Sequence, residues 1–238
     1  MSARSNNTLV LIGSGPGIGR SVASLFAAKR YNRVALIARN SGGIHLEEDR
    51  KAVQAASSPD VVVKTYVCDV TDTEALLRTL DAVEADLGTV ECIYFNAARI
   101  FPQPILEHPW EEIEYDWKTT CEALYATARW GIPKLVDLAK ADETAKPALL
   151  VTNSLLYEDP IPFLFALSMT KAAQRNLVQS LALIYAKEGV HIGVVSVGDS
   201  VNPKAKNLNP GTIAARTWEW FAQSREKQTF EVRILESD

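Results

Sequence analysis

The sequence predicts an α/β fold in which a doubly wound, parallel, seven-stranded sheet carries helices on both faces. Short apolar runs alternate with longer amphipathic stretches along the chain, an alternation typical of strand-helix-strand units. The apolar runs are continuous, as expected of strands that are buried on both faces. We therefore expect a single domain over residues 1–238, with no repeat, linker or low-complexity segment.

Composition narrows the classes of function. Apolar residues make up 47% of the chain and the net charge is only −4. Lysines and arginines are scattered, which argues against a nucleic-acid partner. The polar N-terminus precedes only a short apolar run, so we expect no signal peptide, no membrane partner and a cytoplasmic location. The three cysteines are too far apart for a metal knuckle, and Cys68 and Cys92 lie in apolar runs typical of buried thiols.

The first part of the chain alternates strands and helices. TLVLIG predicts a strand over residues 8–13, and a helix follows at 17–30, after glycines that let the chain turn. RVALIAR predicts a strand at 33–39, followed by a helix at 46–56 that the turn-forming run SSPD ends. VVVKTYVCD predicts a third strand at 61–69, because β-branched residues are frequent in it.

The middle of the chain continues this alternation. Asp72 is expected to cap a helix that ends at Gly88, since Asp is a favoured N-cap and Gly commonly follows a helix. VECIYFNA predicts a fourth strand at 90–97. A long helical stretch then covers residues 110–141.

The last part supplies three more strands. ALLVTNS predicts a strand at 148–154 and VHIGVVSVG one at 190–198, with a helix at 163–188 between them. A helix at 212–223 and a strand at 229–235 complete the sheet. Parallel strands connected by helices give the doubly wound architecture.

Three irregular segments follow the C-terminal ends of strands: 98–109, 155–162 and 199–210. In open α/β sheets, ligands bind outside the carboxyl ends of the strands. We therefore expect the functional site at this edge, and we assign 199–228 as a short substrate-side segment within the single domain.

The loop GSGPGIGR joins the first predicted strand to the first helix. Its spacing is G-x-x-x-G-x-G over Gly13, Gly17 and Gly19, with Ile18 in the third glycine slot of the G-x-G-x-x-G pattern. A glycine turn at a helix N-terminus can hold an anion, because N–H groups point outward and a pyrophosphate can approach closely. A plain tight turn is the alternative. The position after the first strand favours a dinucleotide held by this loop, Ser14 included, in a Rossmann-type fold.

The end of the second strand bears on which dinucleotide binds. About twenty residues beyond the loop, an acidic side chain would bind the 2′-hydroxyl of NAD. The chain has Ala38, Arg39 and Asn40 there, and a guanidinium suits a 2′-phosphate. We predict NADP(H) as the cofactor, with Arg39 and Asn40 among its ligands. The alternative is that Arg39 is a solvated surface charge.

The glycine loop, together with CDV and FNAAR, resembles the short-chain dehydrogenase/reductase family over essentially the whole chain. The resemblance implies that Asp69 and Val70 contact adenine and that Asn96 and Ala97 line the cofactor site. Capping of the sheet edge is an alternative role for Asn96. The resemblance also implies that Val201, after the sixth strand, offers backbone atoms to the carboxamide.

The catalytic half departs from the family pattern. The family uses an Asn, a Ser, a Tyr and a Lys, the last two spaced Y-x-x-x-K. Ser154 and Lys171 match, but the tyrosine slot holds Leu167 and the asparagine slot falls on Thr120. Since i and i+4 are neighbours on a helix, we expect Lys171 to reach the nicotinamide ribose without a phenol beside it. Tyr157 is the best replacement proton donor, and packing on the rim is its alternative role.

These departures shape the predicted reaction. Leucine cannot exchange a proton, and general acid–base catalysis is worth about 10²–10⁴-fold. We predict an NADP(H)-dependent oxidoreductase of non-standard mechanism that acts on a small organic substrate, such as an iminium that needs no proton donor. The alternative is a non-redox protein of the fold: an isomerase, a cyclase or an NADP-sensing binding protein.

Other residues and partners complete the prediction. We expect no metal site. His45 and His191 are expected to lie away from the active site, and His108 is expected to mark a helix entry. The family resemblance implies a homodimer or tetramer paired through the two long helices.

Overall fold

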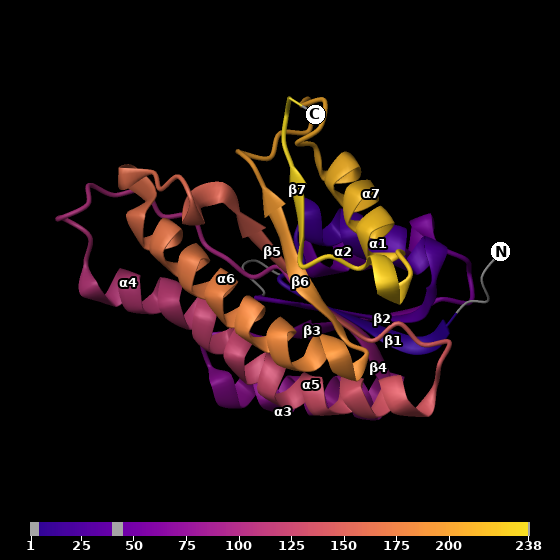
Figure 1. Cartoon of the computed structure of the whole chain (residues 1–238). Coiled ribbons are helices and arrows are strands. Elements are labelled where there is room, and N and C mark those ends of the chain that lie inside the picture. Colours follow the sequence, from indigo (N-terminus) through magenta and orange to yellow (C-terminus); the bar gives the residue numbers. More distant parts are fainter. Residues whose placement is uncertain (1–4, 40–44, 238) are drawn as a thin grey trace.

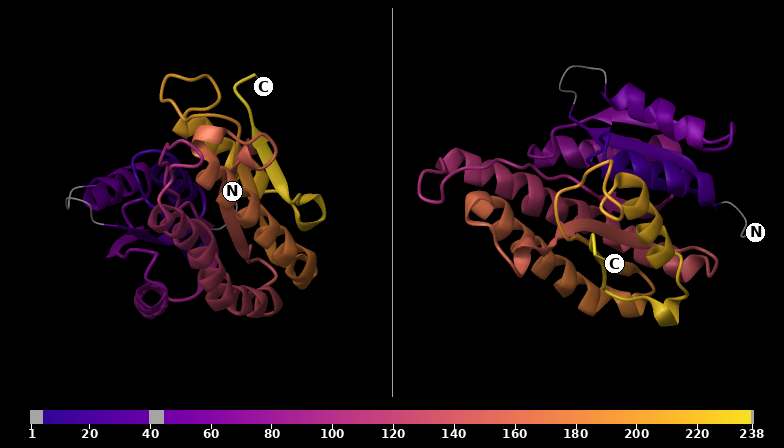
Figure 2. Two further views of the ribbon diagram at one scale, coloured as in Figure 1. Left: turned by 90° about the vertical axis from the view of Figure 1, so that its left-hand side faces the viewer. Right: turned by 90° about the horizontal axis from the view of Figure 1, so that it is seen from above.

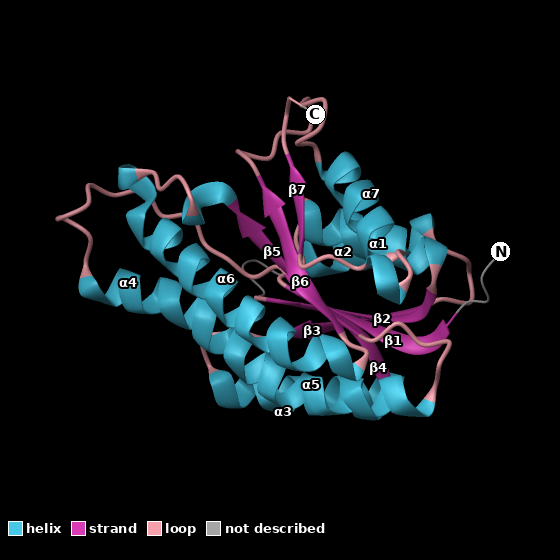
Figure 3. Ribbon diagram, viewed as in Figure 1, coloured by secondary structure: helices cyan, strands magenta, loops and turns pink. Residues whose placement is uncertain are grey.

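A computed structural model describes residues 5–39 and 45–237 of the chain. Its centre is one parallel sheet of seven strands in the order β3-β2-β1-β4-β5-β6-β7, with helices on both faces (Figure 1, Figure 3). The strands are β1 (Ser5–Ile12), β2 (Tyr31–Ala38), β3 (Val62–Val67), β4 (Val90–Phe95), β5 (Ala148–Ser154), β6 (His191–Val197) and β7 (Glu231–Ile234). The predicted doubly wound α/β fold is confirmed.

Two helical layers cover the sheet, as the further views in Figure 2 also show. The α-helices are α1 (Ile18–Lys29), α2 (His45–Ala56), α3 (Thr73–Leu87), α4 (Trp110–Trp117), α5 (Ala123–Ala141), α6 (Phe165–Tyr185) and α7 (Pro210–Phe221). One apolar core lies under α1, α2 and α7, where Phe26 packs against Phe221. The other lies under α3, α5 and α6 and includes Leu80 and Val178. Burial from both sides explains why the strands are continuous apolar runs.

The strand order reverses between β1 and β4, and this places the site. Both strands run parallel, and Ile12 at the end of β1 pairs with Phe95 at the end of β4. Their following residues, Gly13 and Asn96, therefore lie next to each other at the carboxyl edge. Such a reversal point is where α/β sheets bind ligands.

Several predicted boundaries are wrong by a few residues. β1 begins at Ser5 instead of residue 8, because Ser5 pairs with Tyr31 and its hydroxyl donates to the buried Glu91 at 2.8 Å. The predicted helix at 163–188 is α6 flanked by two short 3₁₀ turns, Pro162–Leu164 and Ala186–Glu188. Helix and strand ends depend on local hydrogen bonds that apolar periodicity does not encode.

The predicted helix at 110–141 is not one regular helix. A π-helical turn, Lys118–Glu122, separates α4 from α5. A π turn widens the helix and frees a carbonyl from the regular pattern. The carbonyl oxygen of Thr120 accepts a hydrogen bond from Nε2 of Gln174 on α6 at 3.2 Å. The break thus lies where this helix contacts the predicted active-site helix.

Three further observations concern the cysteines, metal binding and membrane-spanning helices. All three cysteines are buried free thiols, as expected for Cys68 and Cys92. Within residues 5–39 and 45–237, no group of three or more His, Cys, Asp and Glu side chains is arranged to hold a metal ion. No helix in the same described ranges has the length and apolarity needed to span a bilayer.

Candidate cofactor and active site

The turn after β1 can be built only with glycine at its first position. Gly13 has a φ of +88°, and a Cβ there would lie 2.5 Å from the backbone nitrogen of Ala97. Asn96 supports the same turn, because its Nδ2 donates to the carbonyl of Gly13 at 2.9 Å. Its Oδ1 accepts from the Thr152 hydroxyl on β5 at 2.8 Å. The amide of Asn96 therefore ties three strand ends together, which is the sheet-edge role considered for it.

Other glycines of the loop leave space that the chain itself does not fill. A Cβ on Gly15 or Gly17 would meet nothing within 4 Å. Helix α1 begins immediately afterwards, with Gly17 at its N-cap, no side-chain cap and no acidic residue in its first turn. The positive end of the helix dipole is therefore left for an anionic ligand. This arrangement fits a pyrophosphate.

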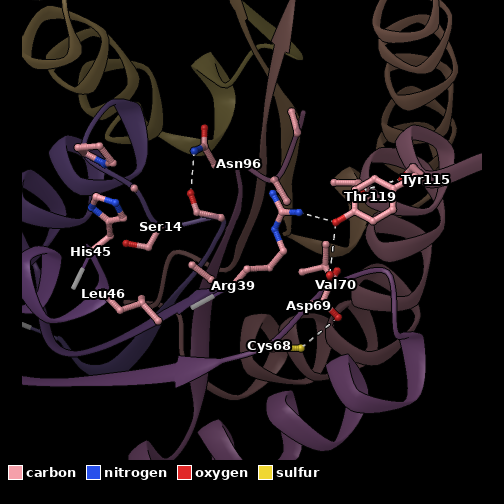
Figure 4. A pocket seen from close by; sticks show the side chains of 16 residues that line it. Ser14, Arg39, His45, Leu46, Cys68, Asp69, Val70, Asn96, Tyr115 and Thr119 are labelled. Atoms are coloured by element: carbon pink, nitrogen blue, oxygen red, sulfur yellow. Dashed lines mark hydrogen bonds between the residues drawn. The ribbon is translucent and has the colours of Figure 1, made fainter. Parts of the chain in front are cut away.

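A cavity of about 300 Å³ opens beside this loop (Figure 4). It is lined by residues from the ends of β1, β2, β3 and β4, and from α2 and the long helix. They include the predicted cofactor ligands Gly13, Ser14, Arg39, Asp69, Val70, Asn96 and Ala97. The predicted ligand Asn40 lies outside the described residues. The structure thus brings together most of the adenosine-side residues that the sequence singled out.

A second hollow of about 490 Å³ adjoins the first and shares Gly15, Pro16 and Asn96 with it. The predicted ligands Gly17, Ile18, Gly19 and Val201 line it. Residues of the glycine loop line both hollows. An elongated ligand such as a dinucleotide fits this pair.

Four residues that sequence reasoning did not place in the site contribute to it. His45 and Leu46 line the adenosine-side cavity. Asp49 is buried and accepts hydrogen bonds from the Ser14 hydroxyl at 2.6 Å and from Nε of Arg20 at 2.5 Å. In sequence, EED resembles a solvated charge run, and nothing marks Asp49 as buried. The fourth residue that the sequence did not place in the site is Tyr115.

Tyr115 links the ends of two strands across the cavity. Its hydroxyl accepts a hydrogen bond from Nη1 of Arg39 and donates to Oδ2 of Asp69 at 3.3 Å (Figure 4). Oδ1 of Asp69 accepts from the backbone and hydroxyl of Thr71, at 3.0 and 2.8 Å. Partial burial raises the pKa of Asp69, but the hydrogen bonds from Thr71 and the charge of Arg39 outweigh it, so its pKa lies below the usual range. Asp69 is therefore ionised at neutral pH.

Lys171 is almost fully buried. Its ammonium donates to the carbonyl of Thr152 at 2.8 Å and to Oε1 of Gln174 at 2.9 Å. Both acceptors are neutral, and burial lowers the pKa of Lys171 to about 8. Gln174 also accepts from Asn153 and donates to the carbonyl of Thr120, so it joins α6, β5 and the π turn. Lysine and glutamine three apart share a helix face, a spacing visible in the sequence.

The remaining predicted catalytic residues lie around the end of β5. Ser154 is its last residue, and its hydroxyl accepts from the backbone of Leu156 at 3.4 Å. Leu167 is buried one turn before Lys171 on α6. Asn153 joins the two elements, since its Nδ2 donates to the carbonyl of Lys171 at 3.1 Å. The end of β5, with Ser154, is thus tied to the helix that carries Leu167 and Lys171.

Tyr157 is engaged elsewhere. Its hydroxyl hydrogen bonds to Glu231 at 2.9 Å and to Arg233 at 2.7 Å, both on β7. Its ring lies against the guanidinium of Arg175, 4.4 Å from the centroid. Burial, followed by hydrogen bonding to Glu231, raises the pKa of Tyr157 despite the lowering effect of Arg175. This placement agrees with the rim-packing role and gives no support to proton donation at neutral pH.

Comparison with known proteins identifies related sequences and folds. A sequence profile described as short chain dehydrogenase matches residues 7–211. Retinol dehydrogenase 10-B of Danio rerio is 29% identical over 143 residues, which cover 54% of this chain and 43% of that protein. The match thus spans less than half of that relative.

Solved structures share the fold over nearly the whole chain. A short-chain dehydrogenase from Rhodopseudomonas palustris superposes with a TM-score of 0.81 at 21% identity, covering 97% of this chain and 99% of that one. L-Sorbose reductase from Gluconobacter frateurii, complexed with NADPH and L-sorbose, gives 0.82 at 18% identity, covering 97% and 95%. An NADH-dependent reductase complexed with NAD gives 0.81 at 16% identity, covering 95% and 94%.

Proposed function

The chain belongs to the short chain dehydrogenase family, and on that premise we propose that it is an NADP(H)-dependent oxidoreductase that works without the family's tyrosine. One observation carries the proposal most directly. The glycine loop opens onto two adjoining hollows, and the Cβ positions of Gly15 and Gly17 point into free space at an uncapped helix N-terminus. When bound there, the cofactor would supply or accept a hydride.

The proposed preference for NADP(H) over NAD(H) depends on the residues at the end of β2. Arg39 lines the adenosine-side cavity, and neither Ala38 nor Arg39 offers the carboxylate that would bind a 2′-hydroxyl. The nearby Asp49 is already engaged by Ser14 and Arg20. Relatives of the same fold are complexed with NADPH or with NAD, so they do not discriminate between the two cofactors. Arg39 is the residue that favours the phosphorylated one.

The reaction that we propose needs no proton donor at position 167. Leu167 stands one turn before Lys171, the spacing of the family's Y-x-x-x-K, and its side chain cannot exchange a proton. A carbonyl substrate gains negative charge on oxygen during reduction and requires a proton there. An iminium substrate gains a hydride at carbon, its π electrons pass to nitrogen, and the product is a neutral amine. The absence of a proton donor at Leu167 therefore narrows the proposed substrates to those, such as a small cationic or conjugated compound, that need none.

Lys171 and Ser154 would orient the substrate side of the site. The ammonium of Lys171 lies at the end of β5, beside the carbonyl of Thr152, and Ser154 follows two residues later. With the cofactor bound, the Lys171 ammonium would exchange its two neutral acceptors for a ribose hydroxyl. Tyr157 has no assigned role in the chemistry, because its hydroxyl contacts β7.

A non-redox protein of this fold is the second candidate. The interior position of the Lys171 ammonium favours it, because both of its hydrogen-bond acceptors belong to the protein. An isomerase, a cyclase or an NADP-sensing binding protein would keep the cofactor loop and dispense with the phenol.

Two measurements test the proposal. Titration calorimetry should show NADPH binding more tightly than NADH, because the 2′-phosphate can pair with Arg39. NADPH oxidation should then be followed by absorbance over matched panels of ketones and cyclic imines. Turnover of imines with little turnover of ketones is the expected result. Tight NADPH binding without turnover of any substrate would favour the non-redox candidate, and absence of binding would overturn both.

A further inference from the structure

Arg39 and Asp69 end neighbouring strands and carry opposite charges, yet they do not pair directly in the structure. Arg39 follows β2 and Asp69 lies two residues beyond β3, and these strands are adjacent in the sheet. Each instead hydrogen bonds to the same phenol, that of Tyr115. Figure 4 shows Tyr115, a residue of α4, facing both side chains. A neutral hydroxyl is thus inserted between a cation and an anion.

Tyr115 is held in this place by contacts that do not involve Arg39. The guanidinium of Arg99 lies over its ring, 4.8 Å from the centroid. Arg99 is in turn held by two carboxylates: its Nε lies 2.7 Å from Oδ1 of the buried Asp116, and it also pairs with Glu112. The carbonyl of Tyr115 accepts from the Thr119 hydroxyl at 2.8 Å. Since Arg99, itself held by α4, packs on the ring, the Tyr115 hydroxyl is a fixed point for the exposed Arg39.

The charged groups around Arg39 explain why its position needs to be held by the Tyr115 hydroxyl. Arg39 is exposed, and an unrestrained guanidinium would be drawn to the ionised Asp69. A direct bidentate pair with a carboxylate would occupy its donors and neutralise its charge. Asp49 and Glu48, on α2 at the other side of the cavity, are engaged by Arg20 instead. His45 also lines this side.

We infer that Tyr115 is a positioning residue that sets the preference for an adenosine carrying a 2′-phosphate. It acts through Arg39, by holding the guanidinium at the cavity wall and keeping it from pairing with Asp69. The inference rests on the proposed function, in that it deepens the assignment of NADP(H). Tyr115 lies 76 positions from Arg39 in the sequence. Without it, the cofactor specificity would be assigned to the end of β2 alone.

The variant Tyr115→Phe tests the inference, because it keeps the ring and removes only the hydroxyl. We expect its affinity for NADPH to fall by about 3- to 10-fold, the range of one typical hydrogen bond, while its affinity for NADH changes less than twofold. Binding of 2′,5′-ADP and 5′-AMP should show the same contrast without any contribution from the nicotinamide. Both sets of dissociation constants are measured by titration calorimetry.

Two further variants make the result specific. Tyr66→Phe is the matched control, because Tyr66 on β3 also donates to a carboxylate, that of Asp86 at 2.9 Å, but does not line the cavity. It should leave both affinities unchanged. In an Arg39→Ala background, Tyr115→Phe should have no further effect on the NADPH to NADH ratio, since the two residues act in series.

The outcomes separate failure of the inference from failure of the proposed function. If the wild-type protein does not prefer NADPH and Arg39→Ala changes nothing, the NADP(H) assignment fails and the inference fails with it. If the preference depends on Arg39 but not on Tyr115, the inference alone is overturned. Equal loss of both cofactors in Tyr115→Phe also overturns it, because the tyrosine would then only shape the adenine pocket.

Discussion

Lys171 shows how one residue can combine a recognisable sequence position with an environment that the sequence does not reveal. Its place four residues after Leu167 is visible in the primary structure. Its burial, and its two neutral hydrogen-bond acceptors, follow from the packing of α6 against β5. A cation without a carboxylate partner in the interior has a lowered pKa, and its charge reduces the stability of the fold.

This burial predicts how stability depends on pH. The pKa of Lys171 is lowered from 10.5 to about 8 in the folded protein. Between these values the unfolded chain binds more protons, so the free energy of unfolding should rise with pH through this window. The gain should be at most about 1.4 kcal/mol per pH unit. Denaturant unfolding of wild type and Lys171→Met across the window measures the difference.

Comparison with the variant isolates this effect. Other titrating groups contribute equally to both proteins and cancel. Below about pH 8 the two curves should run parallel, because Lys171 is then protonated in both the folded and the unfolded state. Equal slopes above that pH would mean that Lys171 is not desolvated as described.

Position 167 predicts a gain of activity. Leu167→Tyr would place a phenol one helical turn from Lys171, where the ammonium can lower its pKa. We expect ketone reduction with NADPH to increase by about 10²- to 10⁴-fold, the usual contribution of general acid catalysis. Leu167→Phe matches the size of tyrosine and lacks the hydroxyl, so it should stay at the wild-type level. A steady-state assay with NADPH measures both, and equal rates would show that the phenol cannot reach the substrate.

At the scale of elements, the glycine loop and the long helix illustrate different limits of prediction. The loop was predictable because its glycines occur directly after the first strand. The π turn between α4 and α5 was not, because KTTCE has no Pro or Gly to mark an interruption. The turn is contacted from α6, through Gln174 and Thr170. Contacts between distant segments are absent from local periodicity.

The loop predicts opposite consequences for two similar substitutions. Gly13→Ala should lower the free energy of unfolding by more than about 2 kcal/mol, because its φ is +88° and its Cβ would overlap Ala97. Gly15→Ala should leave stability nearly unchanged, since its Cβ would meet nothing within 4 Å. Its methyl group would instead occupy the space of the pyrophosphate and weaken NADPH binding about tenfold or more. Thermal unfolding with and without NADPH measures both effects.

One outcome would contradict the prediction for Gly15→Ala. Equal affinity of Gly15→Ala and wild type for NADPH would show that the space beside Gly15 is not a phosphate site.

At the scale of the whole molecule, several large apolar side chains on the outer surface are exposed to solvent. Leu183 and Ile184, on the outer side of α6, are 78% and 53% exposed, and Tyr125 on α5 is 57% exposed. Exposed apolar side chains of this kind are typical of a subunit interface. They lie on the two long helices through which the predicted homodimer or tetramer would form.

This surface gives a prediction about assembly. Leu183→Glu should convert an oligomer into a monomer, because it places a charge in the centre of an apolar contact. Light scattering coupled to size-exclusion chromatography measures the mass. Val62→Glu, at an exposed position on the edge strand β3, serves as the control and should not change the mass. A monomeric wild type, or a Leu183→Glu variant of unchanged mass, would contradict the predicted interface.

The amino-acid sequence by itself determined the architecture and the location of the site. Continuous apolar runs, amphipathic stretches and a glycine turn are local properties, and they act through the backbone conformations and burial of their own residues. They were sufficient to predict the strand and helix sequence, the cofactor edge and Arg39, whereas Asp69 and Lys171 were predicted from the resemblance to the short-chain dehydrogenase/reductase family. Only the tertiary structure decided what these side chains contact. Tyr115 reaches Arg39 and Asp69 from α4, and Asp49 reaches Ser14 from α2, over gaps in the sequence that no local pattern spans.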